Sequence, residues 1–147
     1  MQAKTIKGNS SEEIQAALHE CRNEDFSPTL AIVFISVKQD MDAVSSLLHQ
    51  NGIQVFGTTT SGEFISSEIQ EGSIAIMLLD INPEYFKVAF FEKGENSTHD
   101  IAKQLGTEGK NSFTYPAFII ASGWLQTDGE EIIKGIEEGF GGEATIF

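Results

Sequence analysis

Apolar residues along the chain form two patterns, short continuous runs and stripes at helical spacing. The run over residues 30–36 shows no alternation and therefore predicts a central strand buried on both faces. Asp40 can cap a following helix, whose apolar side carries Met41, Val44, Leu47 and Leu48. Asn51-Gly52 is typical of a helix stop, and residues 53–56 predict the next strand. Such short joints predict a parallel, right-handed crossover unit.

An earlier helix is predicted after Ser10, which has capping-box spacing to Glu13. Its apolar face is formed by Ile14, Ala17, Leu18 and Cys21. Cys21 is the only cysteine, so it cannot form an internal disulfide. Its place on the apolar face favours a small core residue over a reactive thiol.

The middle of the chain predicts a β-hairpin. Residues 73–80 form another apolar run, and Asn82-Pro83 is a turn signal. Residues 85–92 then place Phe86, Val88 and Phe90 on one face, which is typical of a strand. Two strands joined by so short a turn should be antiparallel, so we expect a mixed sheet.

The last third predicts a helix, a strand, a helix and a strand. Ser97 or Thr98 caps a short helix that ends near Leu105, and residues 106–112 form a polar loop. Residues 116–122 predict a second central strand, and Asp128 with Glu131 caps the last helix. The inner face of that helix is predicted to hold Ile132, Ile133, Ile136 and Phe140, before the glycine pair at 141–142 and a strand from residue 144.

Together these elements predict an α/β fold with a mixed, mostly parallel β-sheet and flanking helices. It is built from two βαβ-like units and an intervening β-hairpin. The two units share one order of elements, which a duplication and the general similarity of crossover units explain equally well. The second unit stops in mid-strand at Phe147. Because natural domains rarely end within a buried strand, we expect residues 1–147 to be one domain in a fragment truncated after Phe147.

Composition narrows the class of partner. The chain has 147 residues, enough for one domain with a core. Its 22 acidic and 9 basic residues give a net charge of −13, which repels phosphate backbones and anionic lipids. We therefore expect no nucleic-acid partner and no membrane. The sequence has no transmembrane run and no secretory signal, so we expect a cytoplasmic protein.

No catalytic, cofactor or metal motif is recognised in the sequence. Residues 57–63 lack the lysine of a phosphate-binding Walker loop, and no dinucleotide fingerprint follows any strand. The three histidines, His19, His49 and His99, are far apart in sequence and give no ligand cluster with one cysteine. Ser61-Gly62 lacks the flanking pattern of a nucleophile elbow. We expect no cofactor, no bound metal and no catalytic residue.

One segment offers a candidate ligand site. Residues 57–63 follow a predicted parallel strand, and ligands of open α/β sheets bind beyond the carboxyl ends of strands. Hydroxyl groups suit a small polar ligand, and a carboxylate suits its ammonium group. A tight turn whose hydroxyls bond to backbone groups explains the same residues equally well. The candidate ligand-binding residues are Thr58, Thr59, Thr60, Ser61, Gly62 and Glu63, with Ser122 and Trp124, which follow a second strand and could face a site near the same edge. For Trp124, packing against neighbouring side chains is the alternative to lining a pocket.

Residues 55–64 resemble the N-terminal half of the FIST sensory family, in which a strand leads into a glycine, small hydroxyls and a Gly-Glu pair. Residues 73–80 resemble the family's next apolar strand, and residues 116–142 its late strand and helix before a glycine pair. The resemblance covers residues 28–147. Family members often carry cysteine or serine where Thr58 stands, and alanine where Ser61 stands.

This resemblance implies a non-catalytic, signal-input domain that binds a small polar molecule such as an amino acid. It also implies a C-terminal companion half of the same chain, so that ligand binding biases the arrangement of the two halves. Glu63 and the hydroxyls of residues 58–61 would hold the ligand. Two other functions stay open. One is an enzyme whose active site the companion half completes, and the other is a protein-interaction scaffold with an exposed apolar patch.

Overall fold

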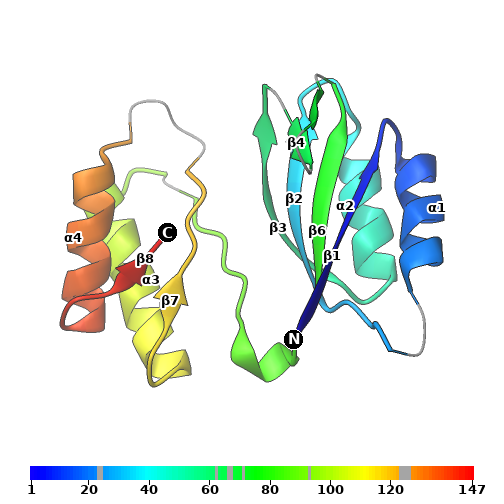
Figure 1. Ribbon diagram of the computed structural model, residues 1–147. Helices are drawn as coiled ribbons and strands as arrows, with labels where there is room; N and C mark the ends of the chain where they lie inside the picture. Colours follow the sequence, from blue (N-terminus) through cyan, green and yellow to red (C-terminus); the bar gives the residue numbers. More distant parts are fainter. Residues whose placement is uncertain (23–24, 62, 66–67, 71, 93, 123–126) are drawn as a thin grey trace. The chain divides into compact units, whose positions relative to one another are not determined.

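The computed structural model describes residues 1–147 except 23–24, 62, 66–67, 71, 93 and 123–126, and within residues 63–65 and 68–70 it describes the backbone alone. The chain divides into two units, Met1–Val88 and Ala89–Phe147 (Figure 1). Each unit has its own buried apolar cluster, and each is described by itself below.

The first unit is built on a four-stranded sheet with the strand order β1-β6-β2-β3. Strands β2 and β3 are parallel, whereas β6 runs antiparallel to both of its neighbours, β1 and β2. The predicted mixed sheet is confirmed, but the prediction of a mostly parallel one is wrong, because β6 returns between β1 and β2. The strands span Gln2–Gly8 (β1), Leu30–Ser36 (β2), Gln54–Thr60 (β3) and Ile74–Asp80 (β6).

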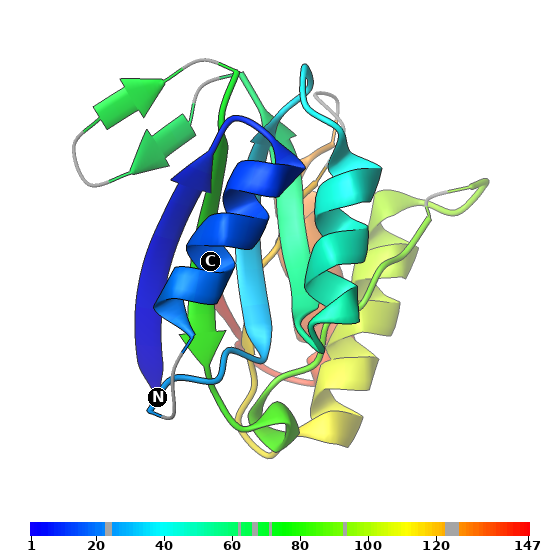
Figure 2. The same cartoon turned by 90° about the vertical axis from the view of Figure 1, so that its right-hand side faces the viewer.

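Helices α1 (Ser11–Cys21) and α2 (Met41–Gln50) lie side by side on one face of this sheet (Figure 2). Their predicted caps are confirmed: Ser10 accepts the backbone N–H of Glu13, and Asp40 accepts that of Ala43. Between helices and sheet lies a core in which the helical side chains are almost completely buried against the strands. The core includes Ile14, Leu18, Val44 and Leu48 from the helices, and Ala31, Val33, Ile35, Ile76 and Leu78 from the strands.

The predicted hairpin after residue 80 is wrong. Strand β6 is followed by a short 3-10 helix, η1 (Pro83–Tyr85), and residues 86–92 carry no strand. The physical reason is that β6 already has a partner on each side, so it has no free edge to offer. Its second partner is β1, whose polar sequence gave no strand signal. A short antiparallel hairpin does form elsewhere, between β4 (Glu63–Ile65) and β5 (Glu68–Gln70).

Among the described residues of the first unit, no α-helix lies on the other face of the sheet (Figure 1). Because strand residues alternate between faces, Ile32 and Phe34 of β2 share this open face with Met77 of β6 and Phe56 of β3. The side chains of Phe34 and Met77 remain 45% and 42% exposed. The continuous apolar run of β2 therefore reflects a strand with one face in the core and one face open.

The second unit contains helices α3 (Thr98–Ser112) and α4 (Gly129–Phe140) and a parallel pair of two-residue strands, β7 (Ala117–Phe118) and β8 (Thr145–Ile146). Ser97 and Asp128 cap the two helices as predicted. The second strand–helix–strand unit is thus confirmed in its parallel direction, but its strands are shorter than residues 116–122 and 144–147.

Helices α3 and α4 pack with their backbones in close contact. A Cβ atom added to Gly106 would lie 2.2 Å from the carbonyl oxygen of Ile136, and one added to Gly139 would lie 2.0 Å from that of Lys103. Helix α3 includes residues 106–112, where a loop was predicted, and its glycines allow this close packing against α4. Ile133 was predicted to face inward, but its side chain is 47% exposed, because Gly135 takes the inner position beside Ala102.

Ion pairs join the outer edges of the same two helices. The Nζ atom of Lys103 and the Nε2 atom of His99 both contact the carboxylate of Glu138, the latter at 3.1 Å. The hydrogen bond and the charge of Lys103 lower the pKa of the Glu138 carboxyl.

Among the described residues, the structure has no helix that is long and apolar enough to cross a membrane.

Candidate functional site

The threonine run lies in a strand, not in a loop. Strand β3 continues to Thr60, four residues past the predicted end at Phe56. Residues paired in a parallel ladder share a face, so Thr58 and Thr60 lie on the open face, beside Phe34 and Ser36 of β2. Thr59 is paired with Ile35 and lies on the helix-covered face. Because the hydroxyls alternate, the three threonines cannot all contact one small ligand.

The carboxyl ends of β2 and β3 form a polar edge, which we call the β2–β3 edge. Ser36 and Thr60 end these strands in register. Ser36 and its neighbour Ser73 are each only 4% exposed. The backbone N–H of Ser36 donates to the carbonyl of Ser73 at 3.0 Å, and the Ser36 Oγ accepts the N–H of Lys38 at 3.3 Å. The backbone of β4 also contacts β2 and β6.

The link from β2 to α2 holds this edge in place. The Gln39 side chain donates to the carbonyl of Gly72 at 2.7 Å, and its backbone N–H donates to the carbonyl of Ser36 at 3.0 Å. Asp40 then begins α2, so the amino-terminal end of this helix follows the β2–β3 edge directly. The first of these hydrogen bonds connects the β2–α2 link to the segment that leads into β6. The β2–β3 edge is therefore held by hydrogen bonds between backbone and side-chain groups.

The predicted site residues are not all brought together. Thr58 is half-buried, and its hydroxyl donates to the carbonyl of Thr59 at 3.3 Å, as the turn interpretation would have it. Thr60 is half-buried, whereas Thr59 and Ser61 are exposed. Ser122 belongs to the second unit, where its hydroxyl donates to that of Thr127 at 3.0 Å. Gly62 and Trp124 lie outside the described residues, as does the side chain of Glu63.

Metal-binding side chains are not clustered in the part of the chain that the structure describes. No three His, Cys, Asp or Glu residues of that part lie close enough to hold a metal ion. His49 contacts the hydroxyl of Ser45 at 3.5 Å, but this is a contact between exposed side chains one turn apart on α2. The chemistry at the β2–β3 edge is that of hydrogen bonding by hydroxyl and backbone groups.

Cys21 lies at the end of α1, half-buried against the core of the first unit. Its thiol donates to the carbonyl of Leu18 at 3.4 Å. Burial raises the pKa of the Cys21 thiol, and the nearby charges of Lys4 and Arg22 only partly oppose this. The predicted core position is confirmed, and the thiolate form that nucleophilic chemistry requires is disfavoured.

We expect Cys21 to react more slowly with iodoacetamide at neutral pH than the free thiol of N-acetylcysteine. The reason is that only the thiolate attacks, and burial lowers its population. Mass spectrometry of the alkylated protein gives the rate, and a titration to alkaline pH should raise it toward that of the unfolded chain in urea. Alkylation at neutral pH that is faster than that of N-acetylcysteine would contradict this expectation.

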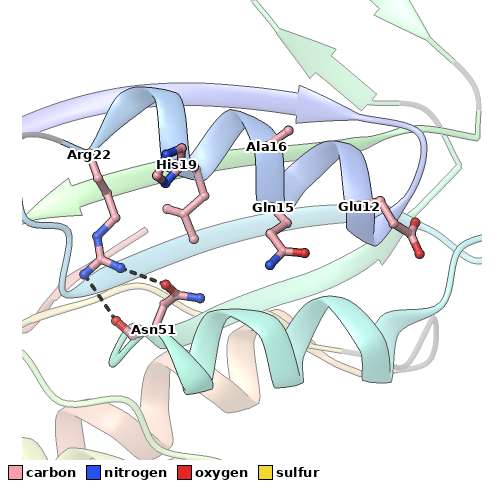
Figure 3. A pocket seen from close by; sticks show the side chains of 7 residues that line it. Glu12, Gln15, Ala16, His19, Arg22 and Asn51 are labelled. Atoms are coloured by element: carbon pink, nitrogen blue, oxygen red, sulfur yellow. Dashed lines mark hydrogen bonds between the residues drawn. The ribbon is translucent and has the colours of Figure 1, made fainter.

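A pocket that the sequence analysis missed lies between α1 and α2, and we call it the α1–α2 groove (Figure 3). It has a volume of about 430 Å³. One side chain in it, Arg22, donates to both the side chain and the backbone carbonyl of Asn51. The signal in the sequence is the polar series Glu12, Gln15, His19 and Arg22, whose spacings of three and four residues place it on one helix face.

The match with known proteins concerns one family. The profile of the FIST N domain matches residues 29–147, which include β2, β3 and the whole β2–β3 edge but neither β1 nor α1. FIST domains are a family of sensory domains, so the match indicates the sensory class of protein. The chain belongs to the FIST N domain family. No curated protein and no solved structure matches the chain.

Proposed function

We propose that the chain is a signal-input module that binds a small polar molecule, such as an amino acid, at the β2–β3 edge. Membership of a sensory family supports the class of function. The observation that carries the location is the in-register pair Ser36 and Thr60 at the carboxyl ends of two parallel strands. Loops and side chains beyond such ends are where ligands of α/β sheets bind.

The proposal assigns the ligand to the hydroxyls of Thr58, Thr60 and Ser61. Thr58 and Thr60 share a face, and Ser61 follows them with an exposed side chain. A hydroxyl donates one hydrogen bond and accepts two, so Thr58 can still accept from a ligand ammonium or amide while it donates to the Thr59 carbonyl. In this proposal, Gly62 and the carboxylate of Glu63 complete the site, whereas Ser122 and Trp124 belong to the second unit and are not part of it. Thr59 is excluded from it by its position on the other face.

Replacing Thr58 with valine tests the site, because valine keeps the shape and removes the hydroxyl. A panel of the twenty amino acids is titrated into the 15N-labelled protein, and binding is followed by amide chemical shifts. A lost hydrogen bond contributes about 0.5–1.5 kcal/mol, so Thr58→Val should weaken the binding of the ligand found by roughly two- to tenfold.

The matched control is Thr59→Val, the same chemical change one residue away on the opposite face. It should leave the affinity within twofold of the original. Equal weakening by both substitutions would mean that the hydroxyl face does not matter, and the proposed site would be wrong. Titration shifts confined to residues outside β3, β4 and the β2–α2 link would contradict it as well.

The open face of the sheet favours a second candidate function, the binding of another protein surface. Phe34 and Met77 are 45% and 42% exposed, and Ile32 and Phe56 lie on the same face. In the proposal, the partner is the C-terminal companion half that the family resemblance implies. The two candidates share the open face at Thr58 and Thr60, but a protein partner would also shift the amides around Met77, which pairs with Ile32 away from the β2–β3 edge.

The alternative of an enzyme has less support. The matching family is one of sensory domains, and the Ser36 hydroxyl accepts the backbone N–H of Lys38. The residue that would decide the question is Glu63, whose side chain lies outside the described residues. A Glu63→Gln variant that retains full ligand affinity would remove this carboxylate from the proposed binding site.

A further inference from the structure

The α1–α2 groove is a second polar site, separate from the β2–β3 edge. Figure 3 shows Glu12, Gln15 and Arg22 projecting from α1 on the side that faces α2. Leu18, which is 2% exposed, lines the groove as part of the core beneath it. The volume of about 430 Å³ falls in the range of small-ligand sites. The groove thus combines an apolar floor with charged and amide groups along one wall.

The guanidinium group of Arg22 is oriented by hydrogen bonds to Asn51, which suits it to binding an anion. Arg22 is the only arginine in a chain of net charge −13, and it follows the last residue of α1. Its Nη1 atom donates to the Asn51 Oδ1 at 2.8 Å, and its Nη2 atom donates to the Asn51 carbonyl at 3.4 Å. These bonds use two of the five guanidinium N–H groups and fix the plane of the side chain. A carboxylate that binds to it therefore costs less side-chain entropy than one that must order a free arginine.

The opposite charge lies at the other end of the groove. Glu12 is in the first turn of α1, where hydrogen bonds from its own backbone N–H and from Ser10 lower the pKa of its carboxyl. Arg22 follows Glu12 by ten positions, which corresponds to about 15 Å along a helix. Gln15 offers an amide donor and acceptor between them. The groove therefore presents a negative end, an amide in the middle and a positive end.

We propose that the α1–α2 groove binds a short extended peptide with free termini. The peptide carboxylate lies at Arg22, its amino group lies at Glu12, and Gln15 bonds to a peptide group between them. An extended chain spans at most about 3.3–3.6 Å per residue, so three or four residues bridge the two charges once the side chains reach inward. A single amino acid is too short to reach both ends. This site goes beyond the proposed function, since α1 lies outside the region that the family profile matches.

The test titrates tetra-alanine into the 15N-labelled full chain and follows the α1 amides and the Asn51 side-chain amide. Tetra-alanine should give saturable shifts there, with at least fivefold weaker binding for N-acetyl-tetra-alanine, for tetra-alanine amide and for alanine. Glu12→Gln should weaken the binding of tetra-alanine at least fivefold and leave that of the N-acetylated peptide unchanged, because the lost partner is the amino group.

The matched control is Glu20→Gln, which removes an exposed carboxylate from the same helix outside the groove. It should change neither the affinity for tetra-alanine nor that for the N-acetylated peptide. Equal effects of Glu12→Gln and Glu20→Gln would show that only the net charge matters and would overturn the proposal. Absence of saturable shifts on α1, or equal affinities for free and blocked peptides, would overturn it too. Shifts confined to the β2–β3 edge would assign the peptide to that site instead, and Thr58→Val, which should have no effect here, keeps the two sites distinguishable.

Discussion

Replacing Gly139 with alanine is expected to destabilise the second unit strongly, although this change usually stabilises a helix. The added Cβ would lie 2.0 Å from the carbonyl oxygen of Lys103 and 2.8 Å from the backbone nitrogen of Thr107. Both atoms belong to the α3 backbone, so no side chain can rotate away and the two helices must separate. Overpacking of this kind costs about 1–3 kcal/mol or more. Hydrogen exchange followed by mass spectrometry should show faster exchange across both α3 and α4.

The control for this prediction is Gly129→Ala, at the first residue of the same helix, where an added Cβ meets nothing within 4 Å. There the lower conformational entropy of the unfolded chain should stabilise the protein by about 0.4–1 kcal/mol. The two substitutions are chemically identical, so opposite signs isolate the contact with α3. If both slowed exchange in α4, the close packing of the two helices would be wrong.

The same glycines explain why the end of α3 was not predicted from the sequence. Glycine has low helix propensity, so a helix was expected to stop before Gly106. In the structure Gly106 lies within the helix. Only glycine fits there, because the carbonyl of Ile136 on α4 leaves no room for a side chain. Ile136 lies thirty positions further along the chain, and no local pattern reports it. Intrinsic propensity is a weak guide wherever tertiary packing decides.

Helix starts were predicted well because they depend on residues close in sequence. Ser10 and Asp40 each accept a backbone N–H three residues later. Strand partners were predicted poorly for the opposite reason. The alternation of residues 85–92 is a real pattern, but a strand also needs a free edge, and β1 and β2 occupy both edges of β6. The polar β1 gave no signal, since it is stabilised by pairing and by one buried side chain, Ile6.

The sequence predicted the hydroxyl residues of the candidate site as one loop, and the structure places three of them along a strand instead. From the sequence, Thr58, Thr59 and Thr60 were predicted to be neighbouring hydroxyls in a loop that starts at Gly57. In the structure the strand continues through Gly57, which pairs with Val33 of β2. This continuation sets the alternation that puts Thr59 on the other face. Only the ladder partners reveal this, and they are twenty-four positions away in the chain.

Replacing Gly57 with alanine is the second substitution with a large expected effect. An added Cβ would lie 2.3 Å from the carbonyl oxygen of Val33 and 2.8 Å from its Cβ atom. Because both positions belong to the paired strand, β3 must move away from β2. We expect the free energy of unfolding of the first unit to fall by about 1–3 kcal/mol or more. Urea denaturation gives the loss, and hydrogen exchange should locate it in β2 and β3. Gln54→Ala, at an exposed position on the same strand, should have little effect.

The Gly57→Ala variant also distinguishes two explanations for the glycine at this position of the segment that resembles the FIST family, residues 55–64. If Gly57 is needed for strand packing, Gly57→Ala lowers stability even without ligand, and added ligand restores part of it because the ligand binds only the folded state. If the glycine instead lets a ligand approach the backbone, alanine should abolish binding while the unfolding midpoint without ligand stays the same. The short distance to Val33 favours the first explanation. On that explanation, the glycine holds β3 against β2, and in the proposed site the hydroxyls of Thr58 and Thr60 that follow it would set the binding specificity.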